Sequence, residues 1–267
     1  MSAELFSLAG RNAIVTGASR GLGEAIARAF AAAGADVALV ARSRAALEEI
    51  AAWISEETGR RAVPIECDVT RAEEVAECVQ TAEAALGPIG VLVNNAGGPL
   101  FNAPFLEIRE EGWRKLLDLN PTSVFRFCQK VGAGMVARRS GSVINVVSVV
   151  ANRRWPELAA YSAAKAGVLN FTQTLAQEWG EAGVRVNAIC PGWVMTDNNR
   201  AFLAGERAER LAIESVPMRR LAEADEIAGT AVWLASDASR YVTGANVSVD
   251  GGLAVAIAED WRALRLR

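Results

Sequence analysis

The chain has 267 residues, about half of them apolar, with a net charge of −3 and no histidine. Without histidine, a Ser-His catalytic pair and a histidine-ligated zinc site are excluded, and the interspersed charges offer no basic field for nucleic acid. No stretch approaches the ~20 apolar residues of a membrane span, and the N-terminus lacks the basic start and apolar block of a signal peptide.

Short runs rich in Val and Ile alternate with longer amphipathic stretches along the whole chain. The runs predict buried strands, and the stretches between them predict helices. Strands buried on both faces and separated by helices indicate a parallel, about seven-stranded sheet with helices on both sides. We therefore predict a single doubly wound α/β domain of the Rossmann type over 1–267. The predicted strands are 12–17, 36–41, 61–67, 89–95, 141–148, 184–190 and 245–251, and the helices include 22–33, 44–58, 71–86 and 159–182.

The first predicted strand ends in a glycine-rich turn, TGASRGLG, followed by an Ala-rich helix. Gly17, Gly21 and Gly23 would let the backbone turn sharply and let phosphates approach closely. The helix N-terminus would then present free N–H groups to a diphosphate. This placement predicts a dinucleotide site; the alternative is an ordinary tight turn.

The end of the second predicted strand indicates which dinucleotide is bound. Binders of NAD usually place an acidic residue there to hold the ribose 2′-hydroxyl. This chain has Arg42 at that point, and Arg20 in the first turn adds a second guanidinium. Two arginines suit the 2′-phosphate of NADP, so we predict NADP(H), with NAD(H) second; the alternative is that both arginines are solvated loop residues.

The third and fourth strand ends carry short polar or small residues. Asp68, in CDVT, is a candidate partner for the adenine amino group, and the small residues of NNAGG (94–98) would let the cofactor pass close to the backbone. Either segment could instead be simple turn chemistry.

Tyr161 and Lys165 lie one helical turn apart in an Ala-rich stretch, on one helix face. A free tyrosine, with a pKa near 10, is a poor acid–base catalyst at neutral pH, and bringing its pKa near 7 requires ~4 kcal/mol. A lysine ammonium ~4 Å away would supply about that much at an effective dielectric of ~20. We therefore expect Lys165 to lower the pKa of Tyr161; the alternative is a surface pair with no role.

These motifs together resemble the short-chain dehydrogenase/reductase family over nearly the full length of the chain. TGASRGLG is similar to the family's cofactor loop, NNAG to its fourth-strand motif and YSAAK to its Tyr-x-x-x-Lys. Ser148, thirteen residues before Tyr161, and Asn120 stand where the family has a catalytic serine and a helix asparagine. CPGWVMT (190–196) is similar to the segment that folds over the nicotinamide, and VTGANVSVDGG to the last strand.

The resemblance implies four catalytic roles. Tyr161 would be the general acid/base, and Lys165 would lower its pKa and hold the nicotinamide ribose. Ser148 would stabilise the substrate carbonyl oxygen, and Asn120 would anchor a water that links Lys165 to solvent. The implied cofactor-binding residues are Gly17, Ser19, Arg20, Gly21, Leu22, Gly23, Arg42, Asp68, Val69, Asn95, Ala96, Gly97, Tyr161, Lys165, Pro191, Gly192, Val194 and Thr196.

Two positions depart from the family pattern. Pro121 follows the relay asparagine, where leucine is common, and proline removes a helical hydrogen bond and kinks the helix. That suits a place where the asparagine already interrupts the helix. In NVVS, which ends at Ser148, a second serine is missing, and we expect little effect from this.

Three segments would supply the substrate contacts: 97–105, 149–157 and the substrate loop 192–217. Their apolar side chains predict a mostly apolar pocket, or else pack only the loops. Arg153 and Arg154 could contact a carboxylate, a phosphopantetheine or an acyl-carrier protein; the alternative is two solvated arginines. The apolar candidates are Leu100, Phe101, Trp155, Trp193, Met195 and Phe202.

The C-terminal extension 254–267 is amphipathic and could pack on a neighbouring subunit, unless it is a frayed terminus. The resemblance implies a homo-oligomer, a tetramer or a dimer, with the Tyr–Lys helix in the interface. The four cysteines show no CxxC spacing and are expected to be buried apolar residues of a cytoplasmic protein, with no metal.

The predicted function is NADP(H)-dependent interconversion of a ketone or aldehyde and an alcohol, on a small-molecule substrate. A narrower alternative is reduction of 3-oxoacyl thioesters. A rival of a different class is a non-catalytic dinucleotide sensor or scaffold, which would have no reason to keep all four catalytic residue types. No nucleic acid or membrane partner is expected.

Overall fold

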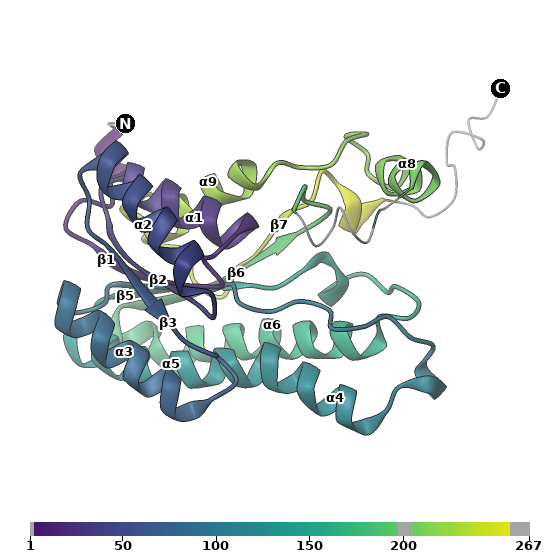
Figure 1. The fold of residues 1–267 in the computed structure, drawn as a ribbon, viewed down its shortest axis with the longest axis horizontal. Coiled ribbons are helices and arrows are strands. Elements are labelled where there is room, and N and C mark those ends of the chain that lie inside the picture. Colours follow the sequence, from purple (N-terminus) through teal and green to yellow (C-terminus); the bar gives the residue numbers. More distant parts are fainter. Residues whose placement is uncertain (1–2, 197–202, 204, 257–267) are drawn as a thin grey trace.

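A seven-stranded sheet, parallel throughout, runs through the middle of the molecule in the order β3-β2-β1-β4-β5-β6-β7 (Figure 1). The computed structural model describes residues 3–196, 203 and 205–256. The strands are β1 (Asn12–Thr16), β2 (Asp36–Ala41), β3 (Ala62–Glu66), β4 (Val91–Asn94), β5 (Gly141–Val146), β6 (Val184–Pro191) and β7 (Asn246–Val249).

Helices cover both faces of this sheet and form the outer layers of the molecule (Figure 1). Side chains of a strand alternate between the faces, so Ala13 and Val15 enter one hydrophobic cluster while Ile14 enters the other. One layer holds α1 (Gly21–Ala32), α2 (Arg44–Thr58) and α9 (Ala224–Ala235); the other holds α3 (Ala72–Leu86), α5 (Ser123–Arg138) and α6 (Ala159–Trp179). At one end of the molecule lie α4 (Glu110–Leu117) and α8 (Glu206–Ser215).

The predicted parallel α/β sheet and its seven strands are confirmed, with ends that differ by one or two residues. The helix predicted over 159–182 is α-helical only to Trp179 and continues as one 3-10 turn, Gly180–Ala182. The four cysteines are free thiols and buried, as expected. Among the described residues, no helix is long and apolar enough to cross a membrane.

Between α4 and α5 the chain forms one π-helical turn, Asp118–Thr122, which contains Pro121. A π turn relaxes the hydrogen-bond ladder at the place where proline lacks its N–H. The expectation that Asn120 and Pro121 interrupt a helix is therefore confirmed.

The strand order reverses at β1, which pairs with β2 on one side and β4 on the other. In doubly wound sheets such a reversal opens a crevice at the carboxyl ends of the strands, where ligands bind. The segments that follow β1 and β4 are the predicted cofactor turn and the NNAGG segment.

Candidate active site

The turn between β1 and α1 is shaped so that only small residues fit. Gly17 has a φ of +67°, which favours glycine. A Cβ added at Gly23 would lie 2.2 Å from the Gly17 carbonyl oxygen and 2.5 Å from Asn95 Nδ2. Arg20 precedes α1 without a side-chain capping bond, so the first turn of α1 can present its N–H groups to a diphosphate.

Thr16 and Asn95 tie this turn to the end of β4. The Thr16 hydroxyl donates to the Val93 carbonyl oxygen (3.2 Å) and accepts from the backbone N–H groups of Asn95 (2.9 Å) and Ala96 (3.0 Å). Asn95 Nδ2 donates to the carbonyl oxygens of Thr16 (2.9 Å) and Gly17 (3.3 Å). Asn95 thus holds the glycine turn by its side-chain hydrogen bonds. These bonds and those of Thr16 fix the segment after β1 relative to the segment after β4.

Arg20 and Arg42 follow the neighbouring strands β1 and β2, and both are exposed. Arg42 lies close enough to Asp68, after β3, to act on its carboxyl group. Burial tends to raise the pKa of Asp68, but hydrogen bonds from Thr70 and the charges of Arg42 and Arg71 lower it. The two arginines therefore lie at the carboxyl ends of neighbouring strands, with the Asp68 carboxyl group near Arg42.

The segment after β6, which lies far from the glycine turn in the sequence, forms another side of the crevice. A Cβ on Gly21 would lie 3.3 Å from Thr196 Cγ2, so this segment meets the glycine turn. Val194 is buried and bridges to Ala222, while Gly192 fits closely against Asp250. Together these turns form a cradle. The positive φ at Gly17 and the close contacts at Gly21 and Gly23 suit a dinucleotide, and the residues present fit NADP(H).

Tyr161 and Lys165 extend from α6 to the carboxyl end of β5. Ser148, which begins the short turn after β5, lies close enough to Tyr161 to oppose the rise in the pKa of its phenol. Lys165 is 3% exposed and its Nζ donates to the Val146 carbonyl oxygen (2.9 Å). The structure therefore brings Ser148, Tyr161 and Lys165 together.

In the protein without cofactor or substrate, Lys165 does not lower the pKa of Tyr161 as expected. Lys165 Nζ lies 5.8 Å from the centre of the Tyr161 ring. Burial raises the pKa of Tyr161, opposed by the hydrogen bond with Ser148, and burial lowers the pKa of Lys165 to about 8. The sequence argument assumed ~4 Å and no desolvation, and desolvation acts in the opposite direction.

Asn120 joins this group through the backbone of Gly98. Its Oδ1 accepts from the Gly98 N–H (3.1 Å), and its Nδ2 donates to the carbonyl oxygens of Gly98 (3.2 Å) and Leu116 (2.9 Å). A Cβ on Gly97 would lie 2.7 Å from Asn120 Oδ1 and 3.3 Å from Lys165 Nζ. Gly97 therefore lies between Asn120 and Lys165, where a larger residue would not fit.

Cys190 also belongs to this group, although the sequence offered only a scattered cysteine. The thiol is fully buried beside Ser148, Lys165 and Asn152. Burial raises its pKa to about 11, opposed by hydrogen bonds with Ser148 and Asn152 and by the Lys165 charge. Its position directly before Pro191, in the segment expected to cover the nicotinamide, was the one signal that could have placed it here.

The predicted substrate residues divide between two hydrophobic clusters that share Tyr161. Phe101 packs with Leu116 on one side, and Trp193 packs with Val216 on the other. Trp155 lies edge-on to Trp193, and Met195 packs with the adjoining group that contains Leu221. Leu100 is half exposed, and Phe202 lies outside the described residues, as does the extension beyond residue 256.

Arg153 and Arg154 differ in their surroundings. Arg153 donates to the Leu253 carbonyl oxygen and lies over the Trp155 ring, 5.9 Å from its centre. Arg154 is exposed. The protein itself therefore holds Arg153 in place.

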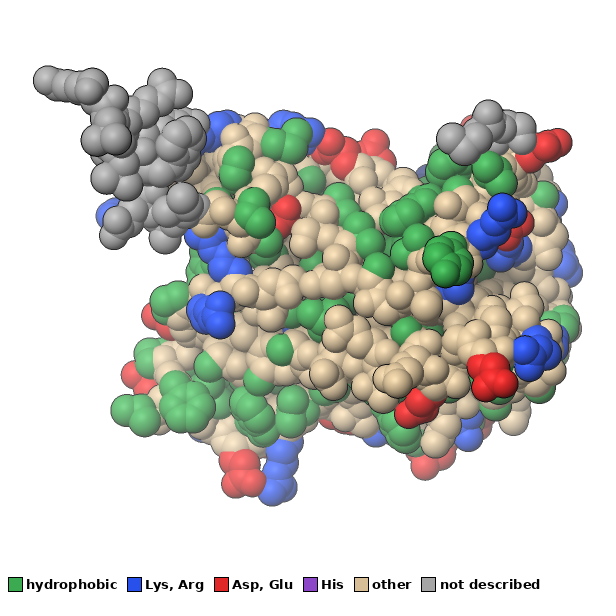
Figure 2. Space-filling view, turned by 180° about the vertical axis from the view of Figure 1, so that it is seen from behind, with side chains coloured by type: hydrophobic (Ala, Val, Ile, Leu, Met, Phe, Trp, Pro, Cys, Tyr) green, Lys and Arg blue, Asp and Glu red, His purple; other side chains and the backbone are tan. Residues whose placement is uncertain are grey.

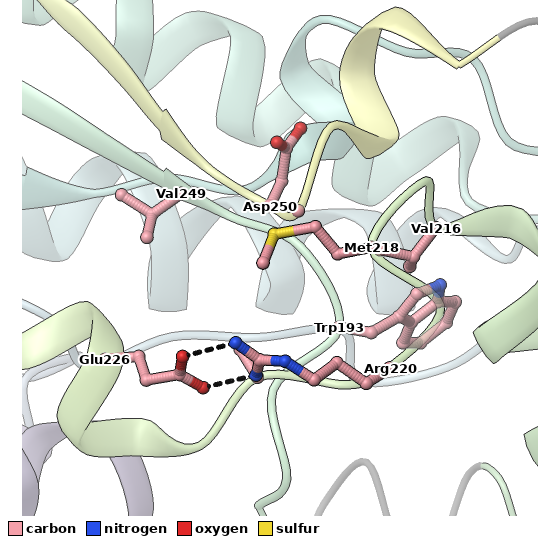
Figure 3. A pocket seen from close by; sticks show the side chains of 9 residues that line it. Trp193, Val216, Met218, Arg220, Glu226, Val249 and Asp250 are labelled. Atoms are coloured by element: carbon pink, nitrogen blue, oxygen red, sulfur yellow. Dashed lines mark hydrogen bonds and ion pairs between the residues drawn. The ribbon is translucent and has the colours of Figure 1, made fainter.

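A cavity of about 100 Å³ lies beside Trp193, behind the segment that follows β6 (Figure 3). Arg220 and Glu226 face one another across two hydrogen bonds of 2.7 Å in its wall. Both carboxylate oxygens of Asp250 accept backbone N–H groups, from Gly252 and Ala254. Because its charged groups are paired within the protein and none of Asn120, Ser148, Tyr161 or Lys165 lines it, we do not take this cavity as the catalytic site.

Known proteins match nearly the whole chain. A family model described as Enoyl-(Acyl carrier protein) reductase matches residues 17–254. A short chain dehydrogenase/reductase, astE, of Aspergillus oryzae is 40% identical over 254 residues, 94% of this chain and 97% of that protein. A 3-oxoacyl-(acyl-carrier-protein) reductase of Chlamydia trachomatis is 39% identical over 247 residues, 92% and 98% of the two chains.

A solved structure has the same fold. The gluconate 5-dehydrogenase of Burkholderia cenocepacia, in complex with NADP and tartrate, has a TM-score of 0.91 at 33% identity, covering 96% of this chain and 100% of its own. The fold, the glycine turn and the matches over almost the full length agree, and the chain belongs to the short-chain dehydrogenase/reductase family.

Proposed function

We propose that Tyr161 is the general acid/base of a carbonyl reductase, with Ser148, Lys165 and Asn120 around it. The chain is an oxidoreductase that interconverts a ketone or aldehyde and an alcohol, and NADP(H) supplies or accepts the hydride. The observation that carries the proposal is that Ser148, Tyr161 and the buried Lys165 meet at the carboxyl end of β5.

In the reducing direction the protein must place a proton on the carbonyl oxygen. The raised pKa of Tyr161 keeps the phenol protonated at neutral pH, so a proton donor is ready before substrate binds. Ser148 would hydrogen-bond the same oxygen as negative charge develops on it. As the phenol gives up its proton, the tyrosinate needs a counter-charge, and Lys165 is mostly protonated below its pKa of about 8.

Asn120 and Lys165 are proposed to return a proton to Tyr161 from solvent. Two observations support this proposal. Asn120 Oδ1 and Lys165 Nζ both lie close to Gly97, and hydrogen bonds fix Asn120 to Gly98. For the cofactor, we propose that Arg20 and Arg42 hold the 2′-phosphate and that the other predicted contacts line the cradle. The adenine role of Asp68 stays a prediction.

A narrower candidate is reduction of a 3-oxoacyl thioester, because several relatives are named 3-oxoacyl-(acyl-carrier-protein) reductases. Other relatives are named gluconate 5-dehydrogenases, so the family alone does not favour the thioester. A homo-oligomer and a cytoplasmic location are also proposed; the buried free thiols support the latter.

The test is NADPH consumption by the purified protein against β-ketoacyl thioesters, α-diketones, cyclic ketones and keto-sugars. Tyr161→Phe should lose at least about 1,000-fold in kcat, because the proton donor is removed, while its NADPH affinity stays within about threefold. Tyr241→Phe is the matched control, since Tyr241 is the chain's other tyrosine and is fully exposed. Turnover that survives in Tyr161→Phe would reject Tyr161 as the acid; tight NADPH binding without turnover on any compound would favour the sensor.

A further inference from the structure

The surroundings of Tyr161 are apolar on both sides. One cluster, with Val149, Val150, Val216 and Leu253 at its centre, packs against both Tyr161 and Trp193. The other, centred on Leu116, Ala160 and Ala164, packs against Tyr161 and Phe101. A substrate that places its carbonyl at the Tyr161 hydroxyl has apolar groups beside it in both directions.

Two polar side chains of the segment after β5, those of Asn152 and Arg153, are engaged by the protein. Asn152 Oδ1 accepts from Asn246 Nδ2 (3.1 Å), and the Asn152 side chain lies near the Cys190 thiol. Arg153 is tied to the Leu253 carbonyl oxygen. These two side chains are committed within the protein, so they are poorly placed to solvate substrate hydroxyl groups.

Trp155 and Trp193 form what we call the aromatic wall. Their ring centres are 5.6 Å apart and their planes meet at 84°, an edge-to-face arrangement. The Arg153 guanidinium lies 5.9 Å from the centre of the Trp155 ring, which adds a cation–π contact to its tie to Leu253. Trp155 is thereby held between Arg153 and Trp193, and Trp193 is held by the cluster that contains Tyr161.

The apolar surface continues outward from the other cluster. The segment that carries Phe101 also exposes large apolar side chains: Leu100 is 51% exposed, Phe105 69% and Leu106 94%. Apolar side chains gather at the end of the molecule that carries α4 (Figure 2), to which this segment leads.

We infer that the aromatic wall of Trp155 and Trp193 selects carbonyl compounds whose C=O adjoins an apolar ring, against polyhydroxylated keto acids. The inference rests on the proposed function, since it takes the Tyr161 hydroxyl as the reacting point. Indole rings supply broad apolar area at fixed positions. Hydroxyl groups of a sugar acid would lose water there without gaining hydrogen bonds, which is unfavourable.

The test compares three ketones with NADPH: 2-tetralone, a bicyclic apolar ketone; 2,3-butanedione, a small ketone without a ring; and 5-keto-D-gluconate. We expect kcat/KM for 2-tetralone to exceed that for 5-keto-D-gluconate by at least about 100-fold. Trp155→Ala should lower kcat/KM for 2-tetralone about 10- to 100-fold, mainly through KM, and change that for 2,3-butanedione by less than about threefold. Trp155→Phe should recover most of the loss.

Trp53→Ala is the matched control, because Trp53 lies on α2, is 37% exposed and contacts Arg28. It should leave all three ketones unchanged. An equal or higher kcat/KM for 5-keto-D-gluconate in the parent protein would overturn the inference. An equal loss for 2-tetralone and 2,3-butanedione in Trp155→Ala would also overturn it, because a merely structural role predicts that result.

A binding measurement separates this inference from the proposed function. Titration of 2-tetralone in the presence of NADP⁺ should quench tryptophan fluorescence saturably, with an affinity at least about tenfold weaker in Trp155→Ala. Quenching without turnover of any ketone would reject the function and leave the wall standing. Turnover of 2,3-butanedione without a preference for 2-tetralone, or without quenching, would reject the wall and leave the function standing. The absence of both turnover and quenching would reject both proposals.

Discussion

At the scale of single residues, the proposed acid–base chemistry uses two groups whose pKa values are shifted in opposite directions by burial. Burial raises the pKa of Tyr161 and lowers that of Lys165 to about 8. The two shifts move the pKa values of the phenol and the ammonium apart, so that the buried ammonium becomes the stronger acid of the two. The cause of both shifts is the loss of water around the two buried groups.

Lys165→Met should stabilise the protein at pH 7 while abolishing activity. The pKa of Lys165 falls from 10.5 to about 8 on folding, a difference of roughly 3 kcal/mol. Below pH 8 both states carry the proton and the folded state bears the full cost of a buried charge. Between pH 8 and 10.5 the unfolded state binds more protons, so the stability of the parent rises with pH.

The variant should therefore be about 1–3 kcal/mol more stable at pH 7, allowing for the lost hydrogen bond to Val146, and its advantage should shrink toward pH 10. Urea unfolding of parent and variant at several pH values measures this. Lys115→Met, at an exposed lysine paired with Glu111, should show no such pH dependence. Parallel stability curves for Lys165→Met and the parent would contradict the shift.

Arg42→Asp should shrink or reverse a preference for NADPH over NADH. The substitution replaces an exposed guanidinium by a carboxylate next to Asp68, which would repel a 2′-phosphate. The ratio of kcat/KM values for the two cofactors measures the effect. Arg44→Asp makes the same charge change at a residue paired with Glu48 and should change the ratio far less; a parent protein with comparable kcat/KM for both cofactors would refute the assignment.

At the scale of secondary-structure elements, the β1–α1 turn depends on close backbone contact. Gly23→Ala places a Cβ 2.2 Å from the Gly17 carbonyl oxygen, so the turn must open. We expect the Kd for NADPH to rise at least about tenfold, measured by fluorescence titration, with a lower melting temperature. Gly229→Ala, inside α9 with nothing within 4 Å of the new Cβ, should keep the Kd and add about 0.5–1 kcal/mol of stability.

Element positions were readable from the sequence because the pattern of burial is local. A run such as DVALVA is buried at every position and predicts an inner strand of a parallel sheet. The glycines of the first turn and the spacing of Tyr161 and Lys165 were equally direct. The π turn was foreseen only as an interruption, since Pro121 shows that a helix is disturbed without showing which hydrogen bonds replace it.

Contacts between segments far apart in the sequence could not be predicted from the sequence. Trp155 and Trp193 meet from segments nearly forty positions apart, and only the packing of the loops brings their rings together. The orientation of Lys165 toward the Val146 carbonyl is another case, because a side chain with four rotatable bonds can reach several partners from one helix position. The burial of Cys190 among the proposed catalytic residues likewise depends on β6 lying beside β5.

At the scale of the whole molecule, α5 and α6 leave an apolar outer surface. A surface cavity of about 380 Å³ there is lined by Pro121, Thr122, Phe125, Gly167, Val168 and Phe171, and Phe125 is 48% exposed. Large exposed apolar patches mark association sites, which supports a homo-oligomer through the helix that carries Tyr161 and Lys165.

Phe125→Glu should therefore lower the mass in solution, because an introduced charge at an apolar interface is costly. Light scattering after size exclusion measures the mass of parent and variant. Phe6→Glu changes a side chain of similar exposure (50%) near the N-terminus and should leave the mass unchanged. A monomeric parent, or an oligomer that persists in Phe125→Glu, would exclude this surface as the interface.

The contact between Gly21 and Thr196 has a consequence for how the protein is made. The glycine turn leaves the ribosome early, but the segment that closes over it follows about 175 residues later, many seconds at ordinary rates of synthesis. The dinucleotide cradle is complete only when β6 has joined the sheet. We therefore expect cofactor binding to stabilise the nearly finished chain and not its early intermediates.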